Sequence, residues 1–267
     1  MFPLNIAQKI GHSVISKIRM VLYALGFFFR VFKETGNFLT KKRGIRRISG
    51  RVLTMQILFT GYEALTIISI IALGLGALII IQGISLLPKF GQGDLIYDIL
   101  IIVITRELGP ILTAFIVIAR SATAISTQLG NMVISHEIEA FMAVGIDPIS
   151  YLVAPRFIGV TFSIIILNIY FNIFGLIGSY FLTLLIKPVK FQEYFFKLLS
   201  KFQFADIFSS LLKCFVFGVI ISLSATIYGL KVEQSSTEIP QVAIKAVSQS
   251  FKYCIVATAI ITMIYYL

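Results

Sequence analysis

Residues 157–186 read FIGVTFSIIILNIYFNIFGLIGSYFLTLLI, which is a run of 30 residues without Asp, Glu, Lys or Arg. About 20 apolar residues are enough for a helix to cross the hydrocarbon core of a bilayer. The run lacks the alternation of polar and apolar residues that marks a strand of a transmembrane barrel. A helix also satisfies its own backbone hydrogen bonds, which hydrocarbon cannot satisfy. The run therefore predicts a transmembrane helix.

Four other stretches of the chain repeat this apolar character. A charge-free run of 24 residues occupies 64–87, and further apolar stretches occupy 95–135, 207–230 and 242–267. In the whole chain 58% of the residues are hydrophobic and 13% are charged, whereas a soluble domain carries about 25% charged residues. This composition excludes a disordered protein, a small disulfide scaffold and a cytosolic enzyme. We expect an all-α polytopic membrane protein, with about five transmembrane helices within residues 52–267.

The basic residues concentrate in the N-terminal segment, residues 1–51. This segment holds eleven of the 23 Lys and Arg residues and one acid, Glu34. Apolar residues at three- and four-residue spacing between 4 and 40 predict a basic amphipathic helix, which lies in the headgroup plane, packs on the membrane domain, or does both. A basic block can bind nucleic acid, but beside a span it favours anionic lipid headgroups and a cytoplasmic location. We therefore expect no nucleic-acid partner.

The spread of Lys and Arg along the chain also predicts its orientation. With the N-terminus inside, five spans place the connections 131–156 and 231–252 inside as well, and the bias of basic residues favours this arrangement. The connection 187–213 lies outside in this topology, and its five lysines are a counter-signal. We expect a cytoplasmic N-terminus.

Arg106 and Glu107 lie inside the second apolar stretch, where each ionisable residue costs on the order of 2.5–3.5 kcal/mol on insertion scales. Pro110 has no N–H to donate to the carbonyl of Arg106, and Gly109 adds freedom, so these two residues predict a hinge. The charges then line a polar cavity at a moving helix, or they pair with neighbouring helices. Spacing alone does not separate these two interpretations.

A stretch of small and polar residues follows at 121–130, with Arg120 before it and Gln128 within it. Small residues let helix backbones approach closely in lipid. A tight seam between helices is therefore the favoured interpretation, and contact with a ligand is the alternative.

Residues 136–144 predict a short amphipathic helix between two spans, on the cytoplasmic side. Ser135 can cap its N-terminus, and Glu137 and Glu139 lie near the favourable positive end. Gly145 ends the helix, and Asp147-Pro148 stops it. Such a helix either inserts into the groove of a partner or lies on the membrane surface.

Six motifs occur in a fixed order between residues 106 and 156. They are Arg106-Glu-Leu-Gly-Pro110, Ala119-Arg-Ser121, Gln128-Leu-Gly-Asn-Met132, Glu137-Ile-Glu-Ala140, Gly145-Ile-Asp-Pro148 and Tyr151-Leu-Val-Ala-Pro-Arg156. In these motifs and in its five-span layout the chain resembles the MlaE/YrbE family of ABC transporter permeases. It departs from the family at Gln128, where an acid is usual, and at 234–240, which lacks the usual Gly-rich, Thr-Thr form.

The resemblance implies a permease subunit in the bacterial inner membrane. It implies that this subunit moves phospholipids or related lipids between the inner and outer membranes. It also implies a homodimer with two ABC ATPase subunits and a periplasmic MCE-domain protein. For such a permease we expect a lipid cavity at Arg106, Glu107, Arg120 and Gln128, with the hinge at Gly109 and Pro110. We expect ATPase coupling through Glu137, Ile138, Glu139, Ala140, Phe141, Gly145 and Asp147.

Catalytic and cofactor motifs are missing from the sequence. There is no Gly-x-x-x-x-Gly-Lys-Ser/Thr to hold phosphates, so ATP and Mg²⁺ are expected on the partner ATPase and no cofactor on this chain. Cys214 and Cys254 lie in apolar stretches, which indicates buried side chains rather than metal ligands. The alternatives are an intramembrane lipid-modifying enzyme, which would need motifs that are absent here, and a solute channel, which would need a selectivity ring.

Overall fold

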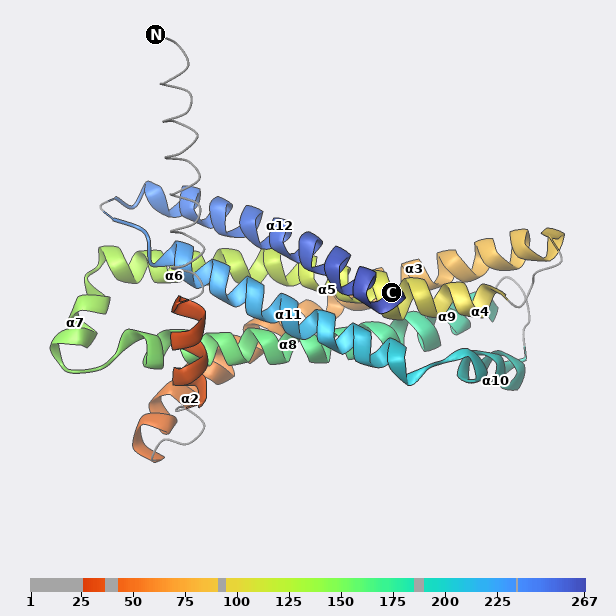
Figure 1. Cartoon of the computed structure of the whole chain (residues 1–267), viewed down its shortest axis with the longest axis horizontal. Coiled ribbons are helices and arrows are strands. Elements are labelled where there is room, and N and C mark those ends of the chain that lie inside the picture. The colour runs from red at the N-terminus through yellow and green to blue at the C-terminus, as the bar shows by residue number, and fades with distance from the viewer. Residues whose placement is uncertain (1–25, 37–42, 91–94, 185–189, 234) are drawn as a thin grey trace, which may run out of the picture.

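The computed structural model describes residues 26–36, 43–90, 95–184, 190–233 and 235–267 (Figure 1). Within these ranges every regular element is a helix, and five helical runs are long and apolar enough to cross a membrane. They are Gly50–Lys89, Leu95–Ile134, Ile149–Gly178, Phe204–Gly229 and Glu238–Tyr266. The chain is thus an all-α polytopic membrane protein, as the sequence predicts.

The first run begins earlier than the charge-free stretch 64–87. Helix α2 (Arg43–Thr60) continues through a 3₁₀ turn at Tyr62–Ala64 into α3 (Leu65–Leu86), and a second 3₁₀ turn follows at Leu87–Phe90. Residues 51 and 52, on either side of the expected boundary, both lie within α2. Residues 26–36 are helical, and the rest of the expected interfacial helix lies outside the described residues.

The second run is one continuous helix with two π-helical segments. It consists of α4 (Leu95–Leu100), the π segment Ile101–Leu108, α5 (Gly109–Val117), the π segment Ile118–Ala122 and α6 (Thr123–Ile134). Arg106 and Glu107 lie in the first π segment and Arg120 in the second. Such π segments are rare and are frequent at functional sites.

The remaining helices complete the bundle. The third run holds a π segment (Ile149–Val153), α8 (Ala154–Ile173) and a π segment (Phe174–Gly178), and α9 (Ser179–Leu184) continues it. Helix α10 (Phe191–Lys201) precedes α11 (Phe204–Gly229), and α12 (Glu238–Tyr266) ends the chain. The charge-free stretch 157–186 stops at Arg156, but the helix continues through this buried residue. The third run therefore begins eight residues earlier, at Ile149.

The long helices lie side by side, with α7 (Glu137–Ala143) at one end of the bundle and α10 at the other (Figure 1). We call these the α7 end and the α10 end. Helix α11 packs against both α8 and α12, and α2 packs against α8. The fully buried side chains include Phe171, Phe217, Ile104 and Ile118. Helix α12 is the least buried of the five runs, and many of its large apolar side chains face outward.

Close backbone contact joins α11 to α8 and to α6. A Cβ atom on Gly218 would lie 2.5 Å from Cα of Thr161, and one on Gly229 would lie 3.0 Å from Cα of Ser126. The second contact confirms the helix seam that the small residues at 121–130 predict.

Replacing Gly218 with Ala is expected to lower the stability of the folded bundle by about 1–3 kcal/mol, because the backbones of α11 and α8 must separate. The midpoint of thermal unfolding in detergent measures this effect. Gly74→Ala is the matched control, since a Cβ there meets nothing within 4 Å and alanine is the better helix former. Equal midpoints for the two variants would contradict the close approach.

Candidate functional site

A side chain of another helix contacts the backbone at the hinge predicted at Gly109-Pro110. Pro110 supplies no N–H to the carbonyl of Arg106, which lies four residues before it. The ammonium of Lys213 on α11 takes that role, because its Nζ donates to the Arg106 carbonyl oxygen at 2.9 Å. The Lys213 side chain is fully buried. The break in the hydrogen bonds of one helix is therefore satisfied by a charged group on another.

Arg106 forms a charge-assisted contact with Asp206, in the first turn of α11. Arg106 Nε donates to Asp206 Oδ1 at 3.0 Å, and its Nη2 donates to the same oxygen. The end of α12 covers this pair. Arg106 Nη1 donates to the hydroxyl of Tyr266 at 2.8 Å, and the guanidinium lies 4.6 Å from the ring centroid of Tyr265, within range of a cation–π contact.

Glu107 binds the same two helices from the neighbouring position. Its carboxylate accepts from Lys213 Nζ at 2.8 Å and from the hydroxyl of Thr262 on α12 at 3.2 Å. We call Arg106, Glu107, Asp206 and Lys213 the charge cluster. It holds two cations and two anions, so each buried charge has a partner of opposite sign, and it joins the second run to α11 and α12.

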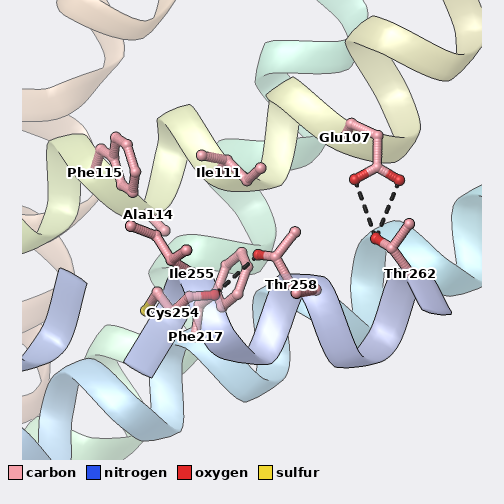
Figure 2. Close-up of a pocket in the computed structure, with 10 residues that line it drawn as sticks. Glu107, Ile111, Ala114, Phe115, Phe217, Cys254, Ile255, Thr258 and Thr262 are labelled. Atoms are coloured by element: carbon pink, nitrogen blue, oxygen red, sulfur yellow. Dashed lines mark hydrogen bonds between the residues drawn. The ribbon is translucent and has the colours of Figure 1, made fainter. Parts of the chain in front are cut away.

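An apolar cavity of about 320 Å³ begins at Glu107 and lies between α5, α11 and α12 (Figure 2). Glu107 and Thr262 lie at one end of it, and Phe115, Phe217 and Cys254 lie at the other. Its walls are apolar apart from Glu107 and two threonines. A cavity with a charged end and an apolar body suits an amphiphile rather than a small polar solute.

The four residues assigned to one lipid cavity do not come together. Arg106 and Glu107 share the charge cluster, but Arg120 pairs with Glu63 at 2.5 Å, with its guanidinium 5.4 Å from the ring centroid of Phe59. Gln128 lies further along the same run and accepts from Nη2 of Arg156 at 3.0 Å. Of the two interpretations of Arg106 and Glu107, the structure shows the pairing with neighbouring helices. Glu107 also lines a cavity.

The predicted amphipathic helix at 136–144 is α7, and its end forms as expected. Gly145 has φ of 77°, a value that glycine adopts without strain. The N–H of Ile146 donates to the carbonyl of Phe141 at 2.9 Å, and the N–H of Gly145 donates to that of Met142 at 3.0 Å. These two bonds form a Schellman cap.

The start of α7 differs from the prediction. Ser135 does not cap it, because its hydroxyl donates to the carbonyl of Asn131 in α6 and to Glu137. The N-cap is His136, in the left-handed conformation with φ of 57°. The chain turns at His136, which leaves Ser135 at the end of α6.

Helix α7 has no buried residue. Glu137, Glu139 and Ala140 are exposed, while Ile138 and Phe141 are half-buried, and the Phe141 ring lies 5.1 Å from that of Tyr151. Large apolar side chains remain uncovered at its end, with Met142 56% and Val144 70% exposed. Asp147 accepts from the N–H of Ser150 at 3.2 Å and so caps the following helix.

The sequence model of the permease MlaE family matches residues 53–264 of this chain. The chain belongs to the MlaE permease family. A probable ABC transporter permease protein of Rickettsia prowazekii is 27% identical over 218 residues, which cover 80% of this chain and 83% of the relative. The intermembrane phospholipid transport system permease protein MlaE of Haemophilus influenzae is 24% identical over 197 residues, 73% of this chain and 76% of the relative. Protein TRIGALACTOSYLDIACYLGLYCEROL 1, chloroplastic, of Arabidopsis thaliana is 24% identical, covering 82% of this chain and 63% of the relative.

Membership of the MlaE family makes the chain a transport subunit rather than an enzyme. The matched region contains the whole charge cluster and α7. It begins within α2, after the basic N-terminal segment.

Sequence reasoning missed two members of the charge cluster in this MlaE permease. Residues 187–213 form the Lys-rich connection of the sequence prediction, but Asp206 and Lys213 lie within α11 and are buried. A signal was present, since the two are seven residues apart and therefore share one face of a helix. Lys213 is also opposite in charge to Glu107, and Asp206 is opposite in charge to Arg106. Lys213 accordingly does not belong to the basic counter-signal in the orientation argument.

Proposed function

We propose that this chain is the membrane-spanning subunit of an ABC transporter that moves phospholipids or related lipids between the inner and outer membranes of a bacterium. The chain would act as a homodimer with two ABC ATPase subunits, which bind ATP and Mg²⁺, and with an MCE-domain protein. The observation that carries the proposal is the apolar cavity with Glu107 and the charge cluster at one end. The Haemophilus influenzae relative is named for intermembrane phospholipid transport, which supports the proposal.

The order of elements suggests how ATP hydrolysis on a partner would reach the cavity. Helix α7 follows α6, and α6 belongs to the same continuous helix as α5 and as Arg106 and Glu107 of the charge cluster. A push on α7 would be transmitted along this helix to the hinge at Gly109-Pro110. The cavity lies between α5 and α12, so a shift of α5 would change its width and move Glu107 relative to Thr262.

In this proposal the α7 end faces the cytoplasm, where the ATPase is. The α10 end then faces the periplasm and the MCE-domain protein. The basic N-terminal segment would lie at the cytoplasmic headgroups, in keeping with the positive-inside rule.

Filling the cavity tests the proposal. In proteoliposomes that contain the chain and its ATPase, Ala259→Trp is expected to lower ATP-dependent transfer of a fluorescent phospholipid about tenfold, equal to about 1.4 kcal/mol in the barrier. Ala259 lines the cavity, whereas Ile260 does not and is 53% exposed, so Ile260→Trp is the matched control.

Normal transfer by Ala259→Trp would contradict a role for the cavity in lipid movement. Lipid turnover by the purified chain without ATP would instead favour the enzyme alternative. Conductance across a planar bilayer would favour a channel.

A further inference from the structure

A larger cavity lies toward the α7 end, away from the charge cluster. It occupies about 790 Å³ between α2, α6 and the start of the third run. This volume is within the range of about 300–1,000 Å³ that small-molecule sites occupy. Phe141 of α7 and Tyr151 lie at its wall. The cavity therefore adjoins the helix that we propose as the contact with the ATPase.

Arg156 lines this cavity and is 2% exposed. Its Nη1 donates to the carbonyl of Leu152 at 3.0 Å, and its Nη2 donates to the side-chain oxygen of Gln128 at 3.0 Å. Both acceptors are neutral. A guanidinium has five N–H donors, so these two bonds leave three donors for a further acceptor.

Two other arginines of the membrane runs, Arg106 and Arg120, show how this chain pairs a cation within a run. Arg106 contacts Asp206 and Arg120 contacts Glu63, so each of them has a carboxylate. The described residues that line the larger cavity include no carboxylate, but they include a second cation, Arg51. A buried charge without a partner of opposite sign is strongly unfavourable. Among the described residues the cavity thus has two positive groups and no anion that would balance them.

The walls of the cavity indicate what kind of anion fits. Its lining includes the apolar side chains of Met55, Phe59 and Met132 and the polar side chains of the two arginines, Gln56 and Gln128. Guanidinium groups match the geometry of phosphate oxygens with paired hydrogen bonds. An occupant that carries both a phosphate and hydrocarbon would contact both kinds of side chain favourably.

We propose that this cavity binds the headgroup of an anionic phospholipid from the leaflet at the α7 end, with its phosphate against Arg156 and Arg51. The site is separate from the charge cluster and from the cavity beside Glu107. The inference goes beyond the proposed transport function, because binding here is measurable whether or not the chain moves lipid.

Native mass spectrometry of the detergent-solubilised full chain, titrated with phosphatidylglycerol or phosphatidylcholine, tests the site. Wild type is expected to bind the anionic lipid more tightly than the zwitterionic one. Gln128→Glu places a carboxylate beside Arg156 with almost no change of shape and is expected to weaken phosphatidylglycerol binding about tenfold. Arg51→Gln is expected to weaken it less, because Arg51 is exposed.

Asn131→Asp is the matched control, since it adds the same charge three residues further along α6 at an exposed position that does not line the cavity. It is expected to leave binding unchanged. Equal lipid binding by wild type and Gln128→Glu, or equal weakening by Asn131→Asp, would overturn the site.

Inorganic phosphate at millimolar concentration distinguishes the two sources of the anion. Lipid that stays bound in its presence supports a phospholipid as the ligand. Displacement of the lipid by phosphate, with phosphate binding lost in Gln128→Glu, would assign the cavity to a free anion and overturn the lipid proposal.

Discussion

Lys213→Met is expected to lower the stability of the folded chain by about 3–5 kcal/mol, because it leaves a charged partner without its counterion. The Lys213 side chain is fully buried and contacts both the Glu107 carboxylate and the Arg106 carbonyl. Without the ammonium, Glu107 keeps the hydroxyl of Thr262 among its described partners, and the carbonyl freed by Pro110 loses the Lys213 donor. The thermal unfolding midpoint in detergent measures the loss, and ATP-dependent lipid transfer should fall with it.

The double variant Lys213→Met with Glu107→Gln separates stability from function. Removing both charges should recover most of the lost stability, since the uncompensated carboxylate is the main penalty. The unbonded Arg106 carbonyl remains and costs about 1–3 kcal/mol. If transfer also recovers, the charges serve to hold the helices together. If transfer does not recover, Glu107 has a further role in handling the lipid.

Lys197→Met is the control for the loss of a lysine. Its side chain is 39% exposed and pairs with Glu193 on the surface of α10. A surface pair of this kind contributes about 0–1 kcal/mol. Similar unfolding midpoints for the Lys213 and Lys197 variants would contradict the assignment of Lys213 to a buried cluster.

Much of the fold was predictable, because hydrophobicity acts along the chain. The stretch 95–135 corresponds to the run Leu95–Ile134, and 242–267 to α12, Glu238–Tyr266. The first span was predicted too short, since α2 carries polar residues such as Arg51 and Gln56 that break an apolar window. In the folded chain Gln56 packs beside Gly159 of α8, and both side chains line the larger cavity.

The partners of the predicted site residues were harder to obtain. Pro110 marked the freed carbonyl of Arg106 in the sequence, but nothing local says which donor reaches it. That donor, Lys213, is more than a hundred residues away, and the pairing depends on how α11 is rotated against the second run. The sequence also does not say which neighbour each residue of one helix faces, and the prediction therefore placed Arg120 and Gln128 in one cavity with Arg106. Residues of one helix share a run but can face different neighbours.

Glu139→Lys is expected to reduce ATP-driven lipid transfer at least about tenfold, because it reverses a charge on the helix that we propose as the contact with the ATPase. Like charges brought together across an interface cost several kcal/mol. The fold should not change, since the Glu139 side chain is 70% exposed and its contact among the described residues is with His136 at 3.0 Å. Lipid transfer and ATP hydrolysis in proteoliposomes, measured beside the unfolding midpoint, separate lost coupling from lost folding.

Glu193→Lys is a control that also tests the orientation of the chain. Glu193 lies in α10, at the opposite end of the bundle, and its side chain is 55% exposed. The same charge reversal there should leave coupling to the ATPase intact, because the proposed orientation places α10 on the periplasmic side. If Glu193→Lys uncouples ATP hydrolysis while Glu139→Lys does not, the ATPase contacts the α10 end. The exposed Met142 and Val144 of α7 would then need a different partner, and the chain would cross the membrane in the inverse sense.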